Sequence, residues 1–380
     1  MQDAYVRALQ HWPVEGTPDA PERWLARVAH NAMVDSLRRD ARTDPLDGDH
    51  RLTAEGPSFD ADDEIRLMFL CCDPVLPRAA QIALVLNVAF GLTARQIAAA
   101  FLSDERTVAQ RIVRAKQRLR DAGIAFEVPD AASRPTRLDA VLDVLYVVFS
   151  EGFVPTDDVA PFDATLCHEA LRLVRLVSES AQTSSPRTYA LRALMCLHAS
   201  RLPARIGVDG GLLLMPEQDR ARWDHALIDE GFTCLSAAAS GDELSRFHIE
   251  AAIAACHATA TTYVNADWPR IVALYDALRE RWPSLVVDVN RALAVAMRSG
   301  ARAGLDELDA IPEREVLGRY PYALAAYADL HASLGNLDEA CAYLDRALEH
   351  QASPAQSALL RRKRAGLALR QDGSANASSA

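Results

Sequence analysis

Residues 77–122, PRAAQIALVLNVAFGLTARQIAAAFLSDERTVAQRIVRAKQRLRDA, decide the fold of this chain. The spacing of their apolar residues predicts three helices, with a tight turn before each of the last two. The first helix, 78–90, is nearly all apolar and should be a buried support, and Gly91 should end it because glycine accepts a positive φ. The second helix, 93–101, is short and begins with a capping box formed by Thr93 and Gln96.

The third predicted helix has one apolar face and a basic remainder. Ser103 or Asp104 should cap it, and apolar residues recur at spacings of four, three and four at Val108, Ile112, Ala115 and Leu119. The other faces carry Arg106, Gln110, Arg111, Arg114, Lys116, Arg118 and Arg120, with no acid between the first and the last. A solvated basic face on an ordinary helical bundle is one explanation. Capping, spacing and charge together favour a helix-turn-helix that places its last helix in the major groove of DNA.

Composition indicates an all-α chain of two or three domains. Its 380 residues are 50% hydrophobic but only 6% aromatic, which is typical of Ala- and Leu-rich helices. The net charge is −11, from 41 basic and 52 acidic residues, so a nucleic-acid contact requires a local basic patch. The chain has no membrane-length apolar run and no signal peptide, and its seven scattered cysteines are typical of reduced, buried thiols in a cytoplasm.

The N-terminal part predicts a second nucleic-acid contact. Residues 1–9 have helical spacing without a preceding cap, and three prolines and a glycine impose a loop on 11–21. A helix from Glu22 to about Ala41 follows, with Trp24 at its start. Polar residues share one of its faces: Asn31, Asp35, Arg38 and Arg39. Taken alone, this pattern fits a surface helix as well as a nucleic-acid contact.

The two elements together resemble a known family. Residues 21–42, PERWLARVAHNAMVDSLRRDAR, look like region 2.3 to 2.4 of a bacterial sigma-70-type factor of the extracytoplasmic-function (ECF) group, and the helix-turn-helix resembles region 4.2. The order of the two, joined by a polar linker, is more specific than either alone. Further stretches are similar to the ECF subgroup with a C-terminal extension of tetratricopeptide (TPR)-like repeats: 62–84, 138–153, 209–224 and 267–283.

This resemblance implies that the chain joins core RNA polymerase and directs it to −10/−35 promoter DNA. The region 4 residues expected to contact the −35 element in duplex DNA are Arg106, Thr107, Gln110, Arg111, Arg114, Lys116 and Arg118. Region 2 captures the opened −10 strand, a role that family pattern assigns to Trp24, Asn31, Asp35, Arg38 and Arg39. Members of the subgroup tend to lack a dedicated membrane anti-sigma factor, and their extension is thought to control activity.

Two departures from the family pattern stand out. Met1 aligns inside region 2.2, so the first helices of region 2, which dock on polymerase, are missing from the alignment; either the start codon is placed too late or the protein is shortened. Asp73 follows Cys71 and Cys72 where the subgroup pattern has histidine. That weakens the case for a metal there, and buried thiols are the commoner arrangement.

The extension should be helical apart from one segment. After a proline-containing linker, 128–136, an apolar helix is expected at 138–149, ending at 150–152, and further helices at 164–178, 186–201, 219–239, 245–260 and 268–281. Extended structure is expected only within 205–220, where residues 209–211 suit a tight turn and 212–215 can cross the core.

Residues 323–349 predict one TPR and 292–311 an earlier copy. Ala328, Ala340 and Ala347 occupy the small positions of a helix pair, and Gly335 marks its turn. Gly300 corresponds to Gly335 about 35 residues upstream, close to the repeat period of roughly 34. Stacked pairs of this kind leave a concave surface for a peptide or protein, or for an intramolecular clamp.

The expected organisation is a partial sigma region 2 (1–42), a linker (43–62), region 4 (63–125), a second linker (126–136), a helical extension (137–285), TPR-like repeats (286–370) and a disordered tail (371–380). The expected partners are core RNA polymerase, promoter DNA and an intramolecular or protein partner at the repeats, without a membrane. No cofactor and no metal are expected.

Parts of the sequence also fit two other functions. A polar cluster suggests an enzyme, at Asp209, Gln218, Asp219, Arg220, Trp223, Asp224 and His225, and four residues could be imagined as metal ligands: Cys196, His198, Cys256 and His257. The chain has no zinc-protease helix motif, phosphate loop or nucleophile elbow, so a structural network around a turn is the better explanation. The other alternative is a repeat-bearing helix-turn-helix regulator that binds DNA without polymerase.

Overall fold

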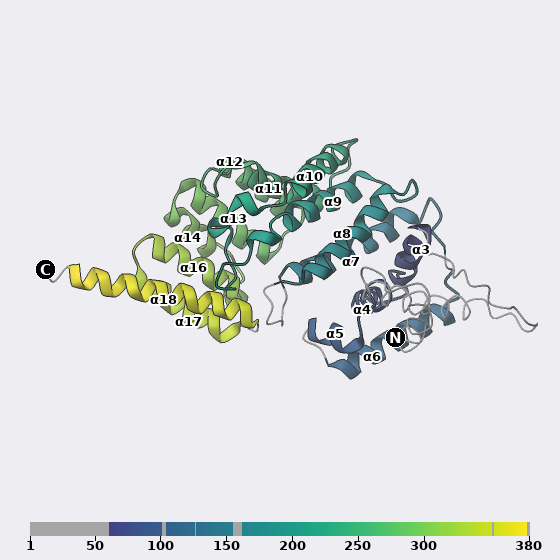
Figure 1. The fold of residues 1–380 in the computed structure, drawn as a ribbon, viewed down its shortest axis with the longest axis horizontal. Helices are drawn as coiled ribbons and strands as arrows, with labels where there is room; N and C mark the ends of the chain where they lie inside the picture. The colour runs from purple at the N-terminus through teal and green to yellow at the C-terminus, as the bar shows by residue number, and fades with distance from the viewer. Residues whose placement is uncertain (1–60, 101–103, 126, 155–161, 352, 378–380) are drawn as a thin grey trace, which may run out of the picture. The chain divides into compact units, whose positions relative to one another are not determined.

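A computed structural model describes residues 61–100, 104–125, 127–154, 162–351 and 353–377, and throughout these ranges the fold is helical (Figure 1). They contain no strand, and the single isolated bridge joins Ile206 to Leu212. The prediction of an all-α fold is confirmed for this part of the chain. Contacts divide the chain into unit 1, residues 1–151 and 165–184, and unit 2, residues 152–164 and 185–380. No helix in the described ranges is long and apolar enough to cross a membrane.

Unit 1 contains six described helices: α3 Ala61–Cys71, α4 Arg78–Val88, α5 Ala94–Ala100, α6 Glu105–Asp121, α7 Arg134–Phe153 and α8 Ala164–Glu179. Apolar side chains of α3 and α4 form much of its core; Phe69, Leu84 and Leu86 are at most 1% exposed. The amide of buried Gln81 donates to the carbonyls of Cys72 and Asp73 at 3.1 and 3.0 Å, which fixes the corner between α3 and α4.

Helix α7 is longer than the sequence predicts at both ends. The Asp130 carboxylate accepts hydrogen bonds from the amides of Ala132 and Ser133, and this turn starts the helix at Arg134, inside the expected linker. Proline at the second helical position is compatible with this because the first turn needs no amide donors. The helix also continues through Gly152 to Phe153. Likewise α3 begins at Ala61, so the last two residues of the first expected linker are helical.

Ion pairs fasten α7 and α8 to α3 and α4. Arg137 lies 2.7 Å from the buried Asp73 carboxylate, and it also donates to the carbonyl of Phe69 at 3.2 Å. Two further connections join Arg78 to Asp143 and Arg172 to Glu64, at 3.6 and 2.7 Å. The first two helices after the expected linker are therefore part of the same compact unit as the helix-turn-helix.

Unit 2 is a series of antiparallel helix pairs (Figure 1). Its helices are α9 Pro186–Ala199, α10 His225–Ala238, α11 Arg246–Thr259, α12 Trp268–Arg281, α13 Leu285–Ser299, α14 Ala301–Asp309, the short α15 Arg314–Leu317, α16 Pro321–Ser333, α17 Leu337–His350 and α18 Pro354–Ala377. Separate apolar clusters join consecutive elements: α9 to α11, α11 to α13, α13 to α16, and α16 to α18. Each pair thus shares its core with its neighbours, as in a helical repeat array.

The two turns expected between paired helices are present. Gly300, between α13 and α14, has φ 97°, and Gly335, between α16 and α17, has φ 83°, a region that glycine adopts without strain. Ala328, Ala340 and Ala347 are at most 1% exposed, as close helix contact requires.

The segment between α9 and α10 is irregular. Three short 3₁₀ turns occupy Leu202–Ala204, Met215–Glu217 and Arg220–Arg222. Gly210 has φ 78° in the expected tight turn, but Leu212 alone of residues 212–215 is buried, so the predicted core-crossing run is wrong. The prediction of a helix from 219 is also wrong: the Asp224 side chain accepts from the amide of Leu227, which starts α10 at His225.

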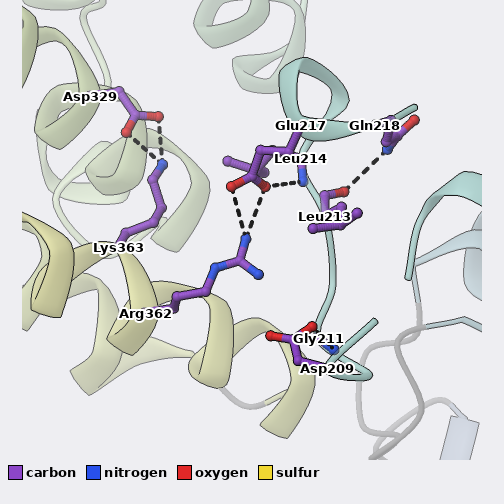
Figure 2. A network of polar contacts seen from close by, with 9 residues as sticks. All are labelled: Asp209, Gly211, Leu213, Leu214, Glu217, Gln218, Asp329, Arg362 and Lys363. Carbon is purple, nitrogen blue, oxygen red and sulfur yellow. Dashed lines mark hydrogen bonds and ion pairs between the residues drawn. The ribbon is translucent and has the colours of Figure 1, made fainter. Parts of the chain in front are cut away.

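The C-terminal helix α18 contacts three separate elements of unit 2. Figure 2 shows Arg362 pointing at the Glu217 carboxylate, with distances of 3.1 and 2.9 Å, and Lys363 at Asp329, 2.7 Å away. Arg364 donates to Asp345 of α17 at 3.0 Å. The helix runs to Ala377, so the expectation of disorder is wrong for residues 371–377. Extending an existing helix requires no new nucleus, which explains why this polar, glycine-containing sequence is helical.

Candidate nucleic-acid interface

Helices α4, α5 and α6 form the predicted helix-turn-helix in unit 1. Gly91 has φ 68° after α4, and the following residue is tied back by two bonds. The amide of Leu92 donates to the carbonyl of Leu86 at 3.0 Å, and the Asn87 side chain donates to the carbonyl of Leu92 at 2.9 Å. These bonds fix the direction in which the chain enters α5. The Gln96 side chain, half of the expected capping box, lies outside the described part.

Asp104 is the N-cap of α6. Its carboxylate accepts hydrogen bonds from the amide of Thr107 at 2.8 Å and from the Thr107 hydroxyl at 3.1 Å. Such a cap satisfies amides that have no partner within the helix. The prediction of a core face is confirmed, since Val108, Ile112, Ala115 and Leu119 are all buried.

The opposite side of α6 is an exposed cationic surface. Arg106, Gln110, Arg114, Arg118 and Arg120 are exposed, whereas Arg111 is half-buried. Within the described ranges, none of the five arginines forms an ion pair. Their charges are therefore available to an external anion, and the exposed faces point away from the core that holds the helix in place. The pattern predicted from the sequence thus forms one surface.

Lys116 differs from the other basic residues of α6. It is half-buried, and its ammonium lies 3.4 Å from the side-chain oxygen of Asn87 on α4. Burial lowers the pKa of this ammonium. A structural contact to α4 thus occupies this residue, which the sequence placed among the DNA contacts.

Two exposed residues were not among the DNA contacts predicted from the sequence. Arg95 lies on α5, the helix that crosses the DNA backbone in helix-turn-helix complexes, and its charge was the available signal. Val113 is 63% exposed in the middle of the basic surface. An apolar residue interrupting a polar face was its signal, and such a side chain suits contact with a thymine methyl group.

Cys71 and Cys72, each 1% exposed, are buried thiols at the end of α3. Burial raises the pKa of both, that of Cys72 to about 12, so neither is a ready nucleophile or metal ligand. No group of three or more potential metal ligands occurs among the described residues.

Two acids of the rival catalytic cluster, Asp219 and Asp224, accept hydrogen bonds from backbone amides. Asp219 accepts from the amide of Ala221, and Asp224 caps α10. Arg220 donates to the carbonyls of His257 and Ala260 at 2.6 and 2.9 Å, at the end of α11. The acids therefore serve the backbone, as a structural network requires.

The region 2 candidates, Trp24, Asn31, Asp35, Arg38 and Arg39, lie outside the described residues. The same holds for the N-terminal helix and loop expected at 1–21.

The geometry of α4 to α6 defines a helix-turn-helix DNA-binding protein. Comparison with family models agrees: Sigma-70 region 2 matches residues 1–43, Sigma-70, region 4 matches 66–119, and a Family of unknown function (DUF6596) matches 137–239. An uncharacterized protein of Rhizobium meliloti (strain 1021), R00370, is 38% identical over 371 residues, covering 95% of this chain and 87% of the other. No solved structure matches the chain. The presence of both sigma-70 regions, in this order, supports a sigma-70-type RNA polymerase sigma factor.

Proposed function

We propose that this sigma factor directs core RNA polymerase to promoters with −10 and −35 elements, and that α6 contacts the −35 element. The observation that carries the proposal is the set of exposed α6 arginines, which form no ion pair with any described residue and lie opposite a buried apolar stripe. Arg106, Thr107 and Gln110 occupy the N-terminal half, which faces base edges in such complexes, and Arg111, Arg114 and Arg118 are placed to hold phosphates or guanine edges. Lys116 supports α6 through Asn87.

The assay for this proposal is in vitro transcription with core polymerase on a promoter from the gene's own upstream region. Replacing Arg106 and Arg114 with glutamine should abolish or strongly reduce transcripts. In binding assays the slope of log affinity against log salt should fall by about 0.9 for each lost phosphate contact. Arg319→Gln, in unit 2, serves as the matched control because its side chain is 71% exposed and far along the chain from α6.

The possible outcomes separate two functions. Transcripts that depend on both arginines support the proposal. Salt-dependent DNA binding without transcripts from any form would instead support a helix-turn-helix regulator acting without polymerase. Unchanged transcription by the double variant would refute the role of α6.

We also propose that the chain is a sigma factor of the ECF group and that the helix pairs of its extension are TPR-like repeats. The extension is proposed to regulate promoter-directed transcription. Support comes from α7 and α8, whose ion pairs with α3 and α4 join the start of the extension to the helix-turn-helix unit. Because α7 and α8 belong to the same unit as region 4, we expect unit 2 to act on region 4 through them.

Truncation tests the regulatory role if the cut respects unit 1. A chain ending at Ser184 keeps α7 and α8, whereas one ending at Ala125 removes Arg137, Arg172 and the apolar face of α7. We expect the shorter chain to lose stability and DNA binding together. The longer one should keep −35 binding but show altered transcription. Unaltered level and specificity of transcription would exclude regulation by unit 2.

A further inference from the structure

A cluster of cationic side chains lies inside unit 2, around two aromatic rings. The Arg201 guanidinium is 5.7 Å from the ring centre of Trp223 and 5.9 Å from that of Phe153. Arg220 lies 4.5 Å from the Trp223 ring and Arg205 lies 4.0 Å from the Phe153 ring. The residues come from the ends of α7 and α9 and from the irregular segment before α10. Segments distant in the chain thus bring three positive charges together.

Neutral groups alone accept the hydrogen bonds of two of these arginines. Arg201 donates to the side-chain oxygen of Gln218 at 3.2 Å, and Arg220 to the carbonyls of His257 and Ala260. Within the described part of the chain, neither Arg201 nor Arg220 has a carboxylate partner. Burying a cation is costly unless an anion offsets the lost hydration. Burial, together with the charges of Arg205 and Arg220, lowers the pKa of Arg201 to about 9.

The same cluster holds buried polar atoms that have no hydrogen-bond partner among the described residues. Nη2 of Arg220 and Nε1 of Trp223 are buried without a hydrogen-bond partner, and so is Nδ1 of His257. Trp223 is only 4% exposed. Buried polar atoms are satisfied in more than about nine cases of ten, so three unpaired atoms on neighbouring residues mark this place as a candidate binding site.

We propose that Arg201, Arg220 and Trp223 bind a small oxyanion, the phosphate or carboxylate group of a soluble ligand. A guanidinium that stacks on an aromatic ring keeps its in-plane N–H groups free to donate, and an oxyanion accepts from several such donors at once. The indole N–H supplies a neutral donor beside them. Chloride would offset the positive charge and a neutral ligand would accept from the donors. An oxyanion does both.

This site belongs to unit 2, whereas the DNA-contacting helix belongs to unit 1, and the inference does not depend on the promoter proposal. It is connected to the C-terminal helix through adjacent residues: Gln218 contacts Arg201, and Glu217 pairs with Arg362 of α18 (Figure 2). The Gln218 amide also donates to the carbonyl of Leu213 at 3.1 Å, which holds the segment that carries Glu217. We therefore expect a ligand at this site to affect the ion pair between Glu217 and Arg362, which holds α18.

The experiment uses the full chain in a chloride buffer at constant ionic strength. Sodium phosphate and sodium acetate are titrated separately, with heat of binding and thermal unfolding as readouts. We expect saturable binding of one of them at one site, with a melting temperature that rises along the same isotherm. Preference for phosphate or for acetate identifies the headgroup.

Variants distinguish a ligand site from a structural network. Trp223→Phe keeps an aromatic ring and removes the orphaned donor, so it should weaken binding about tenfold, and Arg201→Met should weaken it further. Arg302→Gln on α14 is the matched control because its side chain is exposed. If Arg201→Met does not fold, Trp223→Phe decides. Absence of saturable binding, or equal affinity of Trp223→Phe and the parent chain, would overturn the proposal, whatever the result of the promoter assay.

Discussion

Arg137→Met should loosen the junction between α7 and the corner of α3 and α4. The Asp73 carboxylate, with 7% of its side chain exposed, accepts from Arg137 at 2.7 Å and from the amide of Val75 at 2.9 Å. Methionine keeps much of the aliphatic volume and removes the charge. The carboxylate then stays buried with one amide donor.

The expected loss of stability follows from the burial of this pair. Breaking a fully buried ion pair costs 3–5 kcal/mol. Arg137 retains 21% side-chain exposure, so water offsets part of this, and we expect a loss of about 2–4 kcal/mol. The double variant Asp73→Asn with Arg137→Met leaves no buried charge and should be about 1–2 kcal/mol more stable than the single variant.

Cysteine labelling in the native state measures the loss of stability at this junction. Cys71 and Cys72 are each 1% exposed beside the junction, so they react only when it opens. A loss of 2–4 kcal/mol corresponds to labelling faster by about 30- to 900-fold. Cys341, buried in unit 2, is the internal control and should label at its original rate. Unchanged labelling of Cys71 and Cys72 in Arg137→Met, or a double variant less stable than the single one, would refute the reasoning.

Two further predictions concern unit 2. Gly304→Ala should destabilise by about 1–3 kcal/mol despite a better helix propensity, because the new Cβ would lie 2.5 Å from Cβ of Ala296; Gly366→Ala in α18 meets no atom within 4 Å and should stabilise by about 0.5–1 kcal/mol, both measured by urea unfolding. Burial and nearby arginines lower the pKa of His198 to about 3 and of His257 to about 4. Because both values fall below that of the unfolded chain, stability should be complete above pH 6.5 and fall towards pH 4, by about 1.4 kcal/mol per pH unit for each histidine, and His198→Gln should flatten this slope.

The helix-turn-helix could be predicted from sequence because its signals are local. The capping residue Asp104, the apolar stripe of α6 and the positive φ of Gly91 each involve neighbours within a few positions. The same holds for Gly300 and Gly335, whose turns follow from glycine's freedom at positive φ.

The predictions are wrong where two neighbouring local signals conflict. The expected linker before α7 contains proline, but Asp130 starts a turn there and proline fits the first helical turn. Residues 219–224 resemble a helix, yet Asp224 caps a later start. A low-complexity tail suggested disorder, whereas α18 extends into it from a packed part.

Long-range contacts could not be predicted from the sequence. Nothing local pairs Asp73 with Arg137, or Arg362 with Glu217, which is 145 residues away. The cationic cluster around Trp223 is assembled from segments whose separation in the chain hides it. The sequence pattern placed Arg220 and Trp223 in a candidate catalytic cluster, together with acids that cap helices in the structure.

The ion pairs of α18 also set an order of events during synthesis. Glu217, Asp329 and Asp345 are translated before the helix that carries their partners. At roughly 5–20 residues per second, the last helix takes about 1–5 s to make after α17 is complete. During that interval the three acids lack their partners on α18, while the helix pairs made before α18 can already fold. Pairing with α18 therefore changes the charge pattern of unit 2 only after the segments that carry the three acids have been made.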